Sequence, residues 1–388
     1  MHSRLTPDSV LPHDHADAMV VGRVWLPARG GPLPVLVKGG ELHDLSPIAR
    51  TVSQLLEIES PVAAIRSAAR LPQVASLADV LANTDPAQRD TKRPWLLAPC
   101  DLQALKASGV TFVASLLERV IEEQARGDAS RADAVRRAVT EVIGTDLSSI
   151  KPGSPEAMRV KQVLVDKGAW SQYLEVGIGP DAEIFTKSQP LSAVGCGVEA
   201  GIHPQSTWNN PEPEIVLAVN SRGRVQGATL GNDVNLRDFE GRSALLLGKA
   251  KDNNASCAIG PFIRLLDETF TIDDVRACEL ALQVDGPDGF TLAGSSSMSR
   301  ISRDPLDLVA QAIGPHHRYP DGMMLFLGTM FAPTADRFEP GHGFTHVVGD
   351  IVTVHTPRLG ALINRIAHTD KTEPWTFGIA ALIAHLNH

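Results

Sequence analysis

The sequence predicts a mixed α/β fold in which a rolled, mixed β-sheet forms the larger part. From Glu183 to Leu362, short apolar runs are separated by frequent turns rich in Gly, Pro and Asn. This spacing is typical of a rolled mixed sheet and not of alternating βαβ units. An Ala-, Arg- and Glu-rich stretch from Leu116 to about Leu164 predicts helices, broken near Gly127 and again at Lys151-Pro-Gly-Ser-Pro155.

A smaller α/β unit is predicted ahead of this sheet. The apolar runs Val20–Leu26 and Val35–Lys38 predict strands, the Gly-Gly pair before Glu41 predicts a turn, and a helix is expected from Ser53 onward. We therefore expect a flexible tail at residues 1–18, a small N-terminal α/β domain at 19–95 and the main, catalytic domain at 96–388.

Composition narrows the class of protein. The chain has 388 residues, of which 43% are apolar and 21% charged, and its net charge of −9 offers no basic surface for nucleic acid. Four widely spaced cysteines disfavour a zinc cluster and a disulfide framework. Because no apolar run is long enough to span a membrane and the N-terminus lacks an export pattern, we expect a cytoplasmic protein without membrane contact.

Three carboxylates form the strongest candidate site. Glu212 and Glu214 lie two residues apart at the start of an apolar run, so in an extended strand they share one face. Such pairs are common on solvated strands, but a hairpin turn at Asn220–Gly223 would return the chain and bring Asp233 beside them. An all-oxygen set of this kind favours Mg²⁺ or Mn²⁺.

Three other features are weaker. His342 and His346 are four residues apart, but the intervening glycine argues against a helix, so both are interpreted as loop histidines. The Gly195-Cys-Gly197 turn lacks the flanking strand and helix of a dinucleotide site. Arg303 is interpreted as a solvated charge on a possible lid loop.

The ordered motifs resemble the fumarylacetoacetate hydrolase superfamily over most of the chain, from about Asp101 onward. They are Glu212-Pro-Glu214, the Asn-Asp-Val-Asn-Leu-Arg-Asp run around Asp233, the segment from Lys251 to Pro261, and Gly328-Thr329. The resemblance implies a rolled mixed-sheet catalytic domain of that family, with Glu212, Glu214 and Asp233 as ligands of a divalent metal.

Longer phrases resemble one branch of the superfamily, the 2-keto-3-deoxy-D-pentonate dehydratases. They include Gly179-Pro-Asp-Ala-Glu-Ile-Phe-Thr-Lys187 and Lys249-Ala-Lys-Asp-Asn-Asn-Ala-Ser-Cys257. This resemblance implies a hydro-lyase that converts a small 2-keto-3-deoxy sugar acid to 2,5-dioxopentanoate in pentose catabolism. It also implies a homodimer or homotetramer.

The resemblance also implies catalytic residues. Where many superfamily hydrolases carry a water-activating His, this chain has Ser115, while Glu118 is retained three residues later. The loss of His disfavours hydrolysis and does not hinder elimination. Lys251 occupies the position of the family's lysine, and near a dication its pKa is expected to be lowered toward neutrality. We assign proton transfer to Lys251 and Glu118 without dividing the acid and base roles.

Substrate contacts are expected from four residues. Asn253 and Asn254 are candidates for binding substrate hydroxyls, and Thr329 for binding the substrate carboxylate, although Met330 departs from the family's Pro. Arg237 is a candidate too, but is more often expected to support Asp233 through an ion pair. Acylpyruvate hydrolysis, oxaloacetate decarboxylation and non-catalytic binding of a sugar acid remain the alternative functions.

Overall fold

The computed structural model describes residues 1–143, 147 and 150–387. In the described part of the chain, eleven strands form one large mixed sheet. In spatial order they are β4 (Gln73–Ser76), β3 (Glu41–Asp44), β2 (Gly31–Lys38), β1 (Val20–Leu26), β13 (Cys257–Leu265), β11 (Val225–Asp233), β10 (Pro213–Val219), β16 (Met323–Phe326), β6 (Ala104–Ser108) and β7 (Ile184–Ser188), with β5 (Trp95–Leu97) paired to β1.

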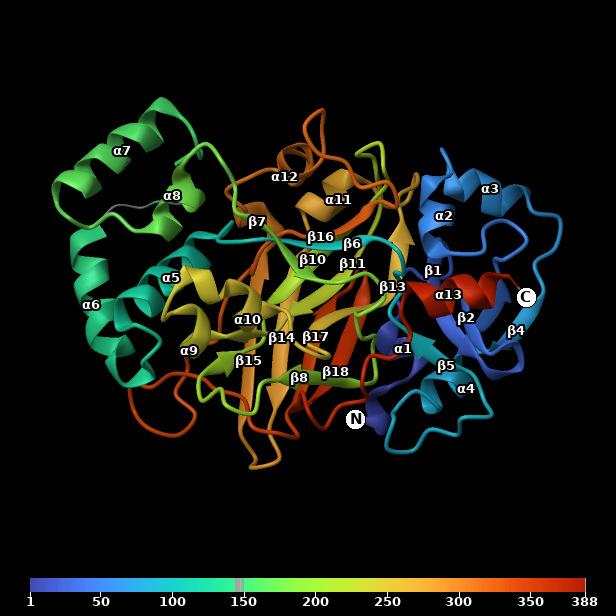
Figure 1. Ribbon diagram of the computed structural model, residues 1–388. Coiled ribbons are helices and arrows are strands. Elements are labelled where there is room, and N and C mark those ends of the chain that lie inside the picture. Colours follow the sequence, from blue (N-terminus) through green and yellow to red (C-terminus); the bar gives the residue numbers. More distant parts are fainter. Residues whose placement is uncertain (144–146, 148–149, 388) are drawn as a thin grey trace.

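A second sheet packs against the first, and the two faces enclose the largest apolar core (Figure 1). Its order is β15 (Thr291–Ser297), β14 (Glu279–Asp285), β17 (Ile351–Thr356), β18 (Gly360–His368) and β8 (Glu199–Ile202). A short ladder joins β9 (Asn209–Asn210) to β12 (Asn235–Leu236). The mixed α/β class and the rolled sheet are confirmed.

Many helices lie at the two ends of the molecule, and α11 and α12 lie between these groups (Figure 1). Figure 1 places α5 to α8 at the end away from the N-terminal strands, while α13 lies beside those strands with the C-terminus. The helix bounds are α1 (Pro7–Val10), α2 (Val52–Glu57), α3 (Pro61–Ser67), α4 (Leu77–Ala82), α5 (Val113–Ala125), α6 (Ala132–Ile143), α7 (Pro155–Asp166), α8 (Gln172–Ile178), α9 (Arg237–Glu240), α10 (Leu247–Lys251), α11 (Ile272–Arg276), α12 (Pro305–Ala312) and α13 (Ile379–Leu386).

The N-terminal residues differ from the expected flexible tail. Val10 and Leu11 are buried in the main core, and Asp14 forms ion pairs with Arg264 at 2.6 Å and Arg358 at 2.9 Å. The apolar side chains of this segment pack into the main core, although its many charged and His residues had suggested a solvated tail. The strand β1 continues the sheet through its pairing with β13, so the segment expected as a small domain shares one sheet with the rest.

The β10–β11 hairpin positions the candidate site. Its strands pair antiparallel from Pro213 opposite Asn232 onward. The turn closes as predicted, with the Asn220 side chain accepting two backbone hydrogen bonds and Gly223 adopting a left-handed φ of 74°. Every residue of β10 is buried, and burying an Ile or Leu contributes about 1.5–3 kcal/mol, so the strand register is strongly determined. No described helix is long and apolar enough to span a membrane.

Candidate metal centre and active site

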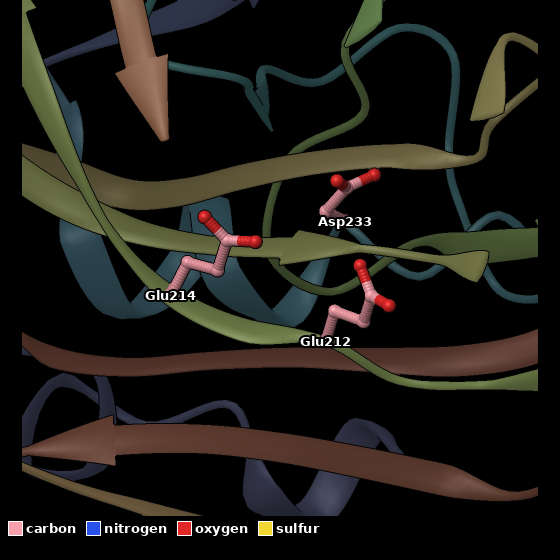
Figure 2. Close-up of side chains that lie close together, drawn as sticks. All are labelled: Glu212, Glu214 and Asp233. Atoms are coloured by element: carbon pink, nitrogen blue, oxygen red, sulfur yellow. The ribbon is translucent and has the colours of Figure 1, made fainter. Parts of the chain in front are cut away.

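The hairpin brings the three predicted carboxylates together. The Asp233 amide donates to the Glu212 carbonyl at 3.0 Å, which continues the ladder one step past the strand and places the two side chains next to each other. One oxygen each from Glu212, Glu214 and Asp233 lies within 4.8 Å of the others, and all three residues are buried (Figure 2). The strand-pair argument from the sequence therefore corresponds to the observed geometry.

Neutral donors hold Glu214. The Gly328 amide donates to Oε2 at 2.7 Å and the Thr329 hydroxyl to Oε1 at 3.2 Å. Gly328 has a φ of 101°, a conformation that glycine adopts without the strain of a Cβ, so the turn can aim both donors at one carboxylate. Burial raises the pKa of Glu214 well above its usual range, and the charges of Asp233 and Glu212 raise it further.

Two buried lysines hold the other carboxylates. The Lys251 ammonium, at the end of α10, contacts Glu212 at 2.5 Å and Asp233 at 3.1 Å. Lys187, on β7, lies 2.8 Å from Asp233 and donates to the Lys251 carbonyl at 2.6 Å. Burial would raise the pKa of Asp233, but Lys187 and Lys251 together lower it.

The pKa of Lys251 depends on the carboxylates that it contacts. Burial alone would lower this pKa, but the charges of Asp233 and Glu212 raise it above the usual lysine range. These two anions therefore favour the ammonium form, and the lowering expected beside a dication stays a prediction.

Arg119 is a site residue that sequence reasoning missed. It follows Ser115 by one turn of α5, and its guanidinium donates to Glu212 and, at 2.5 Å, to Glu122, while lying 3.2 Å from Glu240 on α9. The sequence did hold a signal for Arg119: the spacing of Ser115, Arg119 and Glu122 puts the three side chains on one face of a helix.

The buried cluster is richer in acids than in bases. Within the described residues, the chamber wall and its ion-pair network hold six carboxyl groups and four cationic side chains. They are Glu122, Glu183, Glu212, Glu214, Asp233 and Glu240 against Arg119, Lys187, Arg237 and Lys251. The oxygen donors of the triad are those that Mg²⁺ or Mn²⁺ prefers, so these residues can bind such a metal.

A small chamber lies beside the triad, and a wider space, which we call the mouth, lies near it. The chamber has a volume of about 20 Å³ and is lined by residues that include Ser115, Arg119, Lys251 and Thr329. The mouth, about 140 Å³, lies between α8 and the segment 244–247. Glu183 lines both spaces, so they are neighbours at this residue.

Glu183 is the second residue that was missed. It precedes β7 by one residue, and burial, followed by the charge of Glu240, raises its pKa to about 7. Gly109 allows this placement, because a Cβ there would lie 1.9 Å from Glu183 Oε2. The sequence segment from Gly179 to Lys187, which resembles the dehydratase branch, contains both Glu183 and Lys187. It was the available signal for these two residues, although the resemblance assigned them no role.

Of the two predicted catalytic residues on α5, Ser115 faces the chamber and Glu118 does not. Ser115 lines the chamber, where its hydroxyl donates to the Thr329 carbonyl. Glu118 points to α6 instead, pairing with Arg136 at 3.0 Å, and does not line the chamber. The helical offset that was expected to keep Ser115 and Glu118 together instead gives the chamber-facing position to Arg119.

Three of the four residues predicted to contact substrate lie outside the chamber and the mouth, bonded to other parts of the protein. Asn253 caps the preceding helix through the Lys249 carbonyl, and Asn254 ties down the C-terminal segment through Thr369 and Thr372. Neither lines the chamber or the mouth.

Arg237 is buried, but it bonds Asn210 at 2.8 Å and Glu122 at 3.2 Å, so it neither lines the chamber nor pairs with Asp233. Thr329 does line the chamber, with its hydroxyl on Glu214.

Two weaker predictions also have outcomes. Arg303 is not a solvated charge: it is buried and donates to the carbonyls of Val176 and Gly179 at the end of α8. His346 is a loop residue as expected, but it is buried and its Nδ1 lies 2.9 Å from Asp350.

Fold and site together place a buried acidic cluster on a rolled mixed sheet, and comparisons with known proteins show what the chain is similar to. Residues 212–367 match the family model "Fumarylacetoacetate (FAA) hydrolase C-terminal". The structure is similar to "2-keto-3-deoxy-D-arabinonate dehydratase complexed with magnesium and 2,5-dioxopentanoate", with a TM-score of 0.61 and 20% identity over 90% of this chain and 99% of that one. At this identity the likeness establishes the fold, which is fumarylacetoacetate-hydrolase-like.

Two curated relatives are similar in sequence. A 2-dehydro-3-deoxy-D-arabinonate dehydratase of Saccharolobus solfataricus is 29% identical over 49% of this chain and 60% of its own length. A probable 2-keto-3-deoxyxylonate dehydratase of Haloferax volcanii is 27% identical over 50% of this chain and 63% of its own length. The chain thus aligns with less than two thirds of either relative.

Proposed function

We propose that this protein is a divalent-metal-dependent hydro-lyase that converts 2-keto-3-deoxy-D-pentonate to 2,5-dioxopentanoate. The observation that carries the proposal is the convergence of Glu212, Glu214 and Asp233 with Lys251 and Glu183 around one small chamber. The names of the two curated relatives support the choice of substrate class.

The triad would hold the metal, Mg²⁺ or Mn²⁺. When bound there, a divalent cation would supply Lewis-acid polarisation of the substrate's C2 carbonyl, which acidifies the C3 protons. Neutral donors hold Glu214, so within the described residues no ion-paired cation competes with the metal for its oxygens, whereas Glu212 and Asp233 also keep Lys251 close to the same point.

The reaction requires several proton transfers. C3 loses a proton and C4 its hydroxyl, together one water, which leaves a C3–C4 double bond. A proton then leaves C5 and another returns to C3, giving an enol across C4 and C5. This enol becomes the aldehyde when C4 gains a proton and the C5 hydroxyl loses one, so the net change is the loss of one water.

Glu183 is suited to these transfers. With a pKa of about 7, its carboxyl group is populated in both the acid and the base form near neutral pH, which is the optimum for a general acid–base group. Lys251, kept as an ammonium by its two anionic partners, can donate a hydrogen bond or a proton to a developing oxyanion or leaving hydroxyl.

Ser115 favours dehydration over hydrolysis as the reaction. Its hydroxyl is bound to the Thr329 carbonyl, and a serine there cannot replace an imidazole as a water-activating base. Elimination needs no such base.

The test is product analysis with three substrates. Magnesium-loaded protein is incubated with 2-keto-3-deoxy-D-xylonate, its L-enantiomer and an acylpyruvate, and products are followed by mass spectrometry. We expect 2,5-dioxopentanoate from the D-acid. Pyruvate from the acylpyruvate, with neither deoxy acid consumed, would overturn the proposal in favour of a hydrolase.

A further inference from the structure

The mouth of the active site has one polar and one apolar wall. Helix α8 and Glu183 form one side, and the segment leading into α10 forms the other. The lining residues are Gln172, Tyr173, Val176, Glu183, Ala244 and Leu247. The mouth shares Glu183 with the chamber, and the chamber residues Glu240 and Arg119 act electrostatically on Tyr173 in the mouth, so a molecule that reaches the triad from this side contacts these side chains.

The chamber cannot hold a whole sugar acid. Its volume of about 20 Å³ is close to the roughly 10–15 Å³ that one water needs. The mouth, at about 140 Å³, is several times larger. A substrate with its keto-acid end at the triad therefore extends its remaining carbons past Glu183 into the mouth.

Tyr173 brings a hydrogen-bond donor to that space. The residue is only 5% exposed, and its hydroxyl makes no hydrogen bond to any residue that the structure describes. Among the described residues, this hydroxyl is not one of the fully buried polar atoms that lack a partner, so part of it is accessible to a ligand in the mouth that Tyr173 lines. Burial, followed by the charge of Glu240, raises the pKa of Tyr173, so the hydroxyl keeps its proton and remains a donor.

The helix that carries Tyr173 is firmly held. At its start, Ser171 and Gln172 donate to the Glu123 carboxylate at 2.5 and 2.8 Å. At its end, the buried Arg303 donates to the Gly179 carbonyl at 2.7 Å. Gln172 is thus already engaged by the protein, and Tyr173 is the residue of α8 whose donor is free for a ligand. A donor fixed in this way loses little entropy on binding.

We infer that Tyr173 is a specificity-determining residue that donates a hydrogen bond to a substrate oxygen beyond C3. Leu247 and Ala244 form the facing apolar wall, which limits how far the substrate chain can extend. The preferred ligand is therefore a short 2-keto acid that carries a hydroxyl near its far end. This inference rests on the proposed function and adds the residues that bind the end of the substrate far from the metal.

The chain offers a matched pair for the test, because Tyr173 and Tyr319 are its two tyrosines. Tyr319 packs edge-on against His317 and lines neither chamber nor mouth. Full-length Tyr173→Phe and Tyr319→Phe proteins are assayed with magnesium and 2-keto-3-deoxy-D-pentonate, and Mg²⁺ affinity is measured by calorimetry. We expect kcat/KM to fall by about 3- to 10-fold in Tyr173→Phe, with Mg²⁺ affinity unchanged, and no change in Tyr319→Phe.

A second variant tests the apolar wall independently of Tyr173. Leu247→Phe narrows the mouth, so it should raise KM for a six-carbon 2-keto-3-deoxy acid by a larger factor than for the five-carbon acid. Equal KM changes for both acids, or wild-type kcat/KM in Tyr173→Phe, would overturn the inference while leaving the proposed function intact. A fall in Mg²⁺ affinity that accounts for the lost activity would reduce Tyr173 to a structural role and overturn it as well. If the wild-type protein consumes no deoxy acid, the proposed function itself fails, which is a separate and recognisable result.

Discussion

The carboxyl group of Glu183 lies directly over the Cα of Gly109. A Cβ at position 109 would stand 1.9 Å from Glu183 Oε2 and 2.6 Å from Cδ, so no other residue fits without moving the acid. The Gly109 amide also donates to the Glu183 carbonyl at 3.0 Å, which fixes the two backbones together where β6 and β7 meet. Gly109 is therefore a positioning residue for Glu183.

Gly109→Ala should lower turnover by displacing Glu183 while leaving the triad intact. We expect kcat to fall by at least about 10-fold, since a displacement of about 1 Å at a reacting group can cost 100-fold. Mg²⁺ affinity by calorimetry should stay within about twofold. The matched control is Gly248→Ala in α10, where an added Cβ meets nothing within 4 Å. Equal activity of the two variants would contradict the role given to Gly109.

Glu183 should make stability depend on pH in a defined direction. Its pKa is raised from 4.5 to about 7 on folding, so the folded state binds the proton more tightly. That contribution to stability is fully present below the unfolded pKa and is lost as pH rises through about 7. Relative to wild type, Glu183→Gln should therefore gain up to about 3 kcal/mol between pH 5 and pH 8. Urea unfolding with chelator at both pH values measures this, and a pH-independent difference would refute it.

Replacing Glu183 should lower kcat much more than replacing Glu118. Because Glu183 lines the chamber and Glu118 is engaged by Arg136, Glu183→Gln should reduce kcat by about 100- to 10,000-fold. Glu118→Gln should reduce kcat far less, by under about 10-fold. Steady-state kinetics of both variants decides the matter, and a larger loss in Glu118→Gln would restore the assignment made from the family pattern.

Replacing Arg119 should lower the free energy of unfolding. Its methionine variant leaves the carboxylates of Glu122, Glu212 and Glu240 without their shared buried cation, and breaking such a pair typically costs about 3–5 kcal/mol. Arg137→Met is the control, because its pair with Asp133 is exposed and worth at most about 0.5 kcal/mol. Equal unfolding free energies for the two variants would contradict the assignment of a buried network.

The triad and its hairpin were predictable because short-range rules determine them. Alternating strand geometry orients Glu212 and Glu214, and the Asn220–Gly223 turn returns the chain so that Asp233 arrives opposite. The breaks that separate α5 from α6 and precede α7 followed in the same way from Gly127 and residues 151–155.

The rest of the site depends on contacts between distant segments. Glu183 lies 74 positions from Gly109, and Arg119 reaches Glu212 from 93 positions away. Helical spacing placed Ser115 and Glu118 on one face, but in the packed structure Arg119 lines the chamber and Glu118 pairs with Arg136. The partners of Asn254 were not predictable for the same reason, since Thr369 and Thr372 come from the C-terminal segment.

The most direct test of the central claim is product formation by wild-type protein and the Asp233→Asn variant. Both are stripped of metal, restored with Mg²⁺ and given 2-keto-3-deoxy-D-xylonate, while 2,5-dioxopentanoate is quantified by mass spectrometry. We expect magnesium-dependent product from the wild type, none without metal, and at least about a 100-fold loss in Asp233→Asn together with weakened Mg²⁺ binding. Equal product with and without metal, or undiminished turnover in Asp233→Asn, would contradict a metal-dependent dehydratase built on this triad.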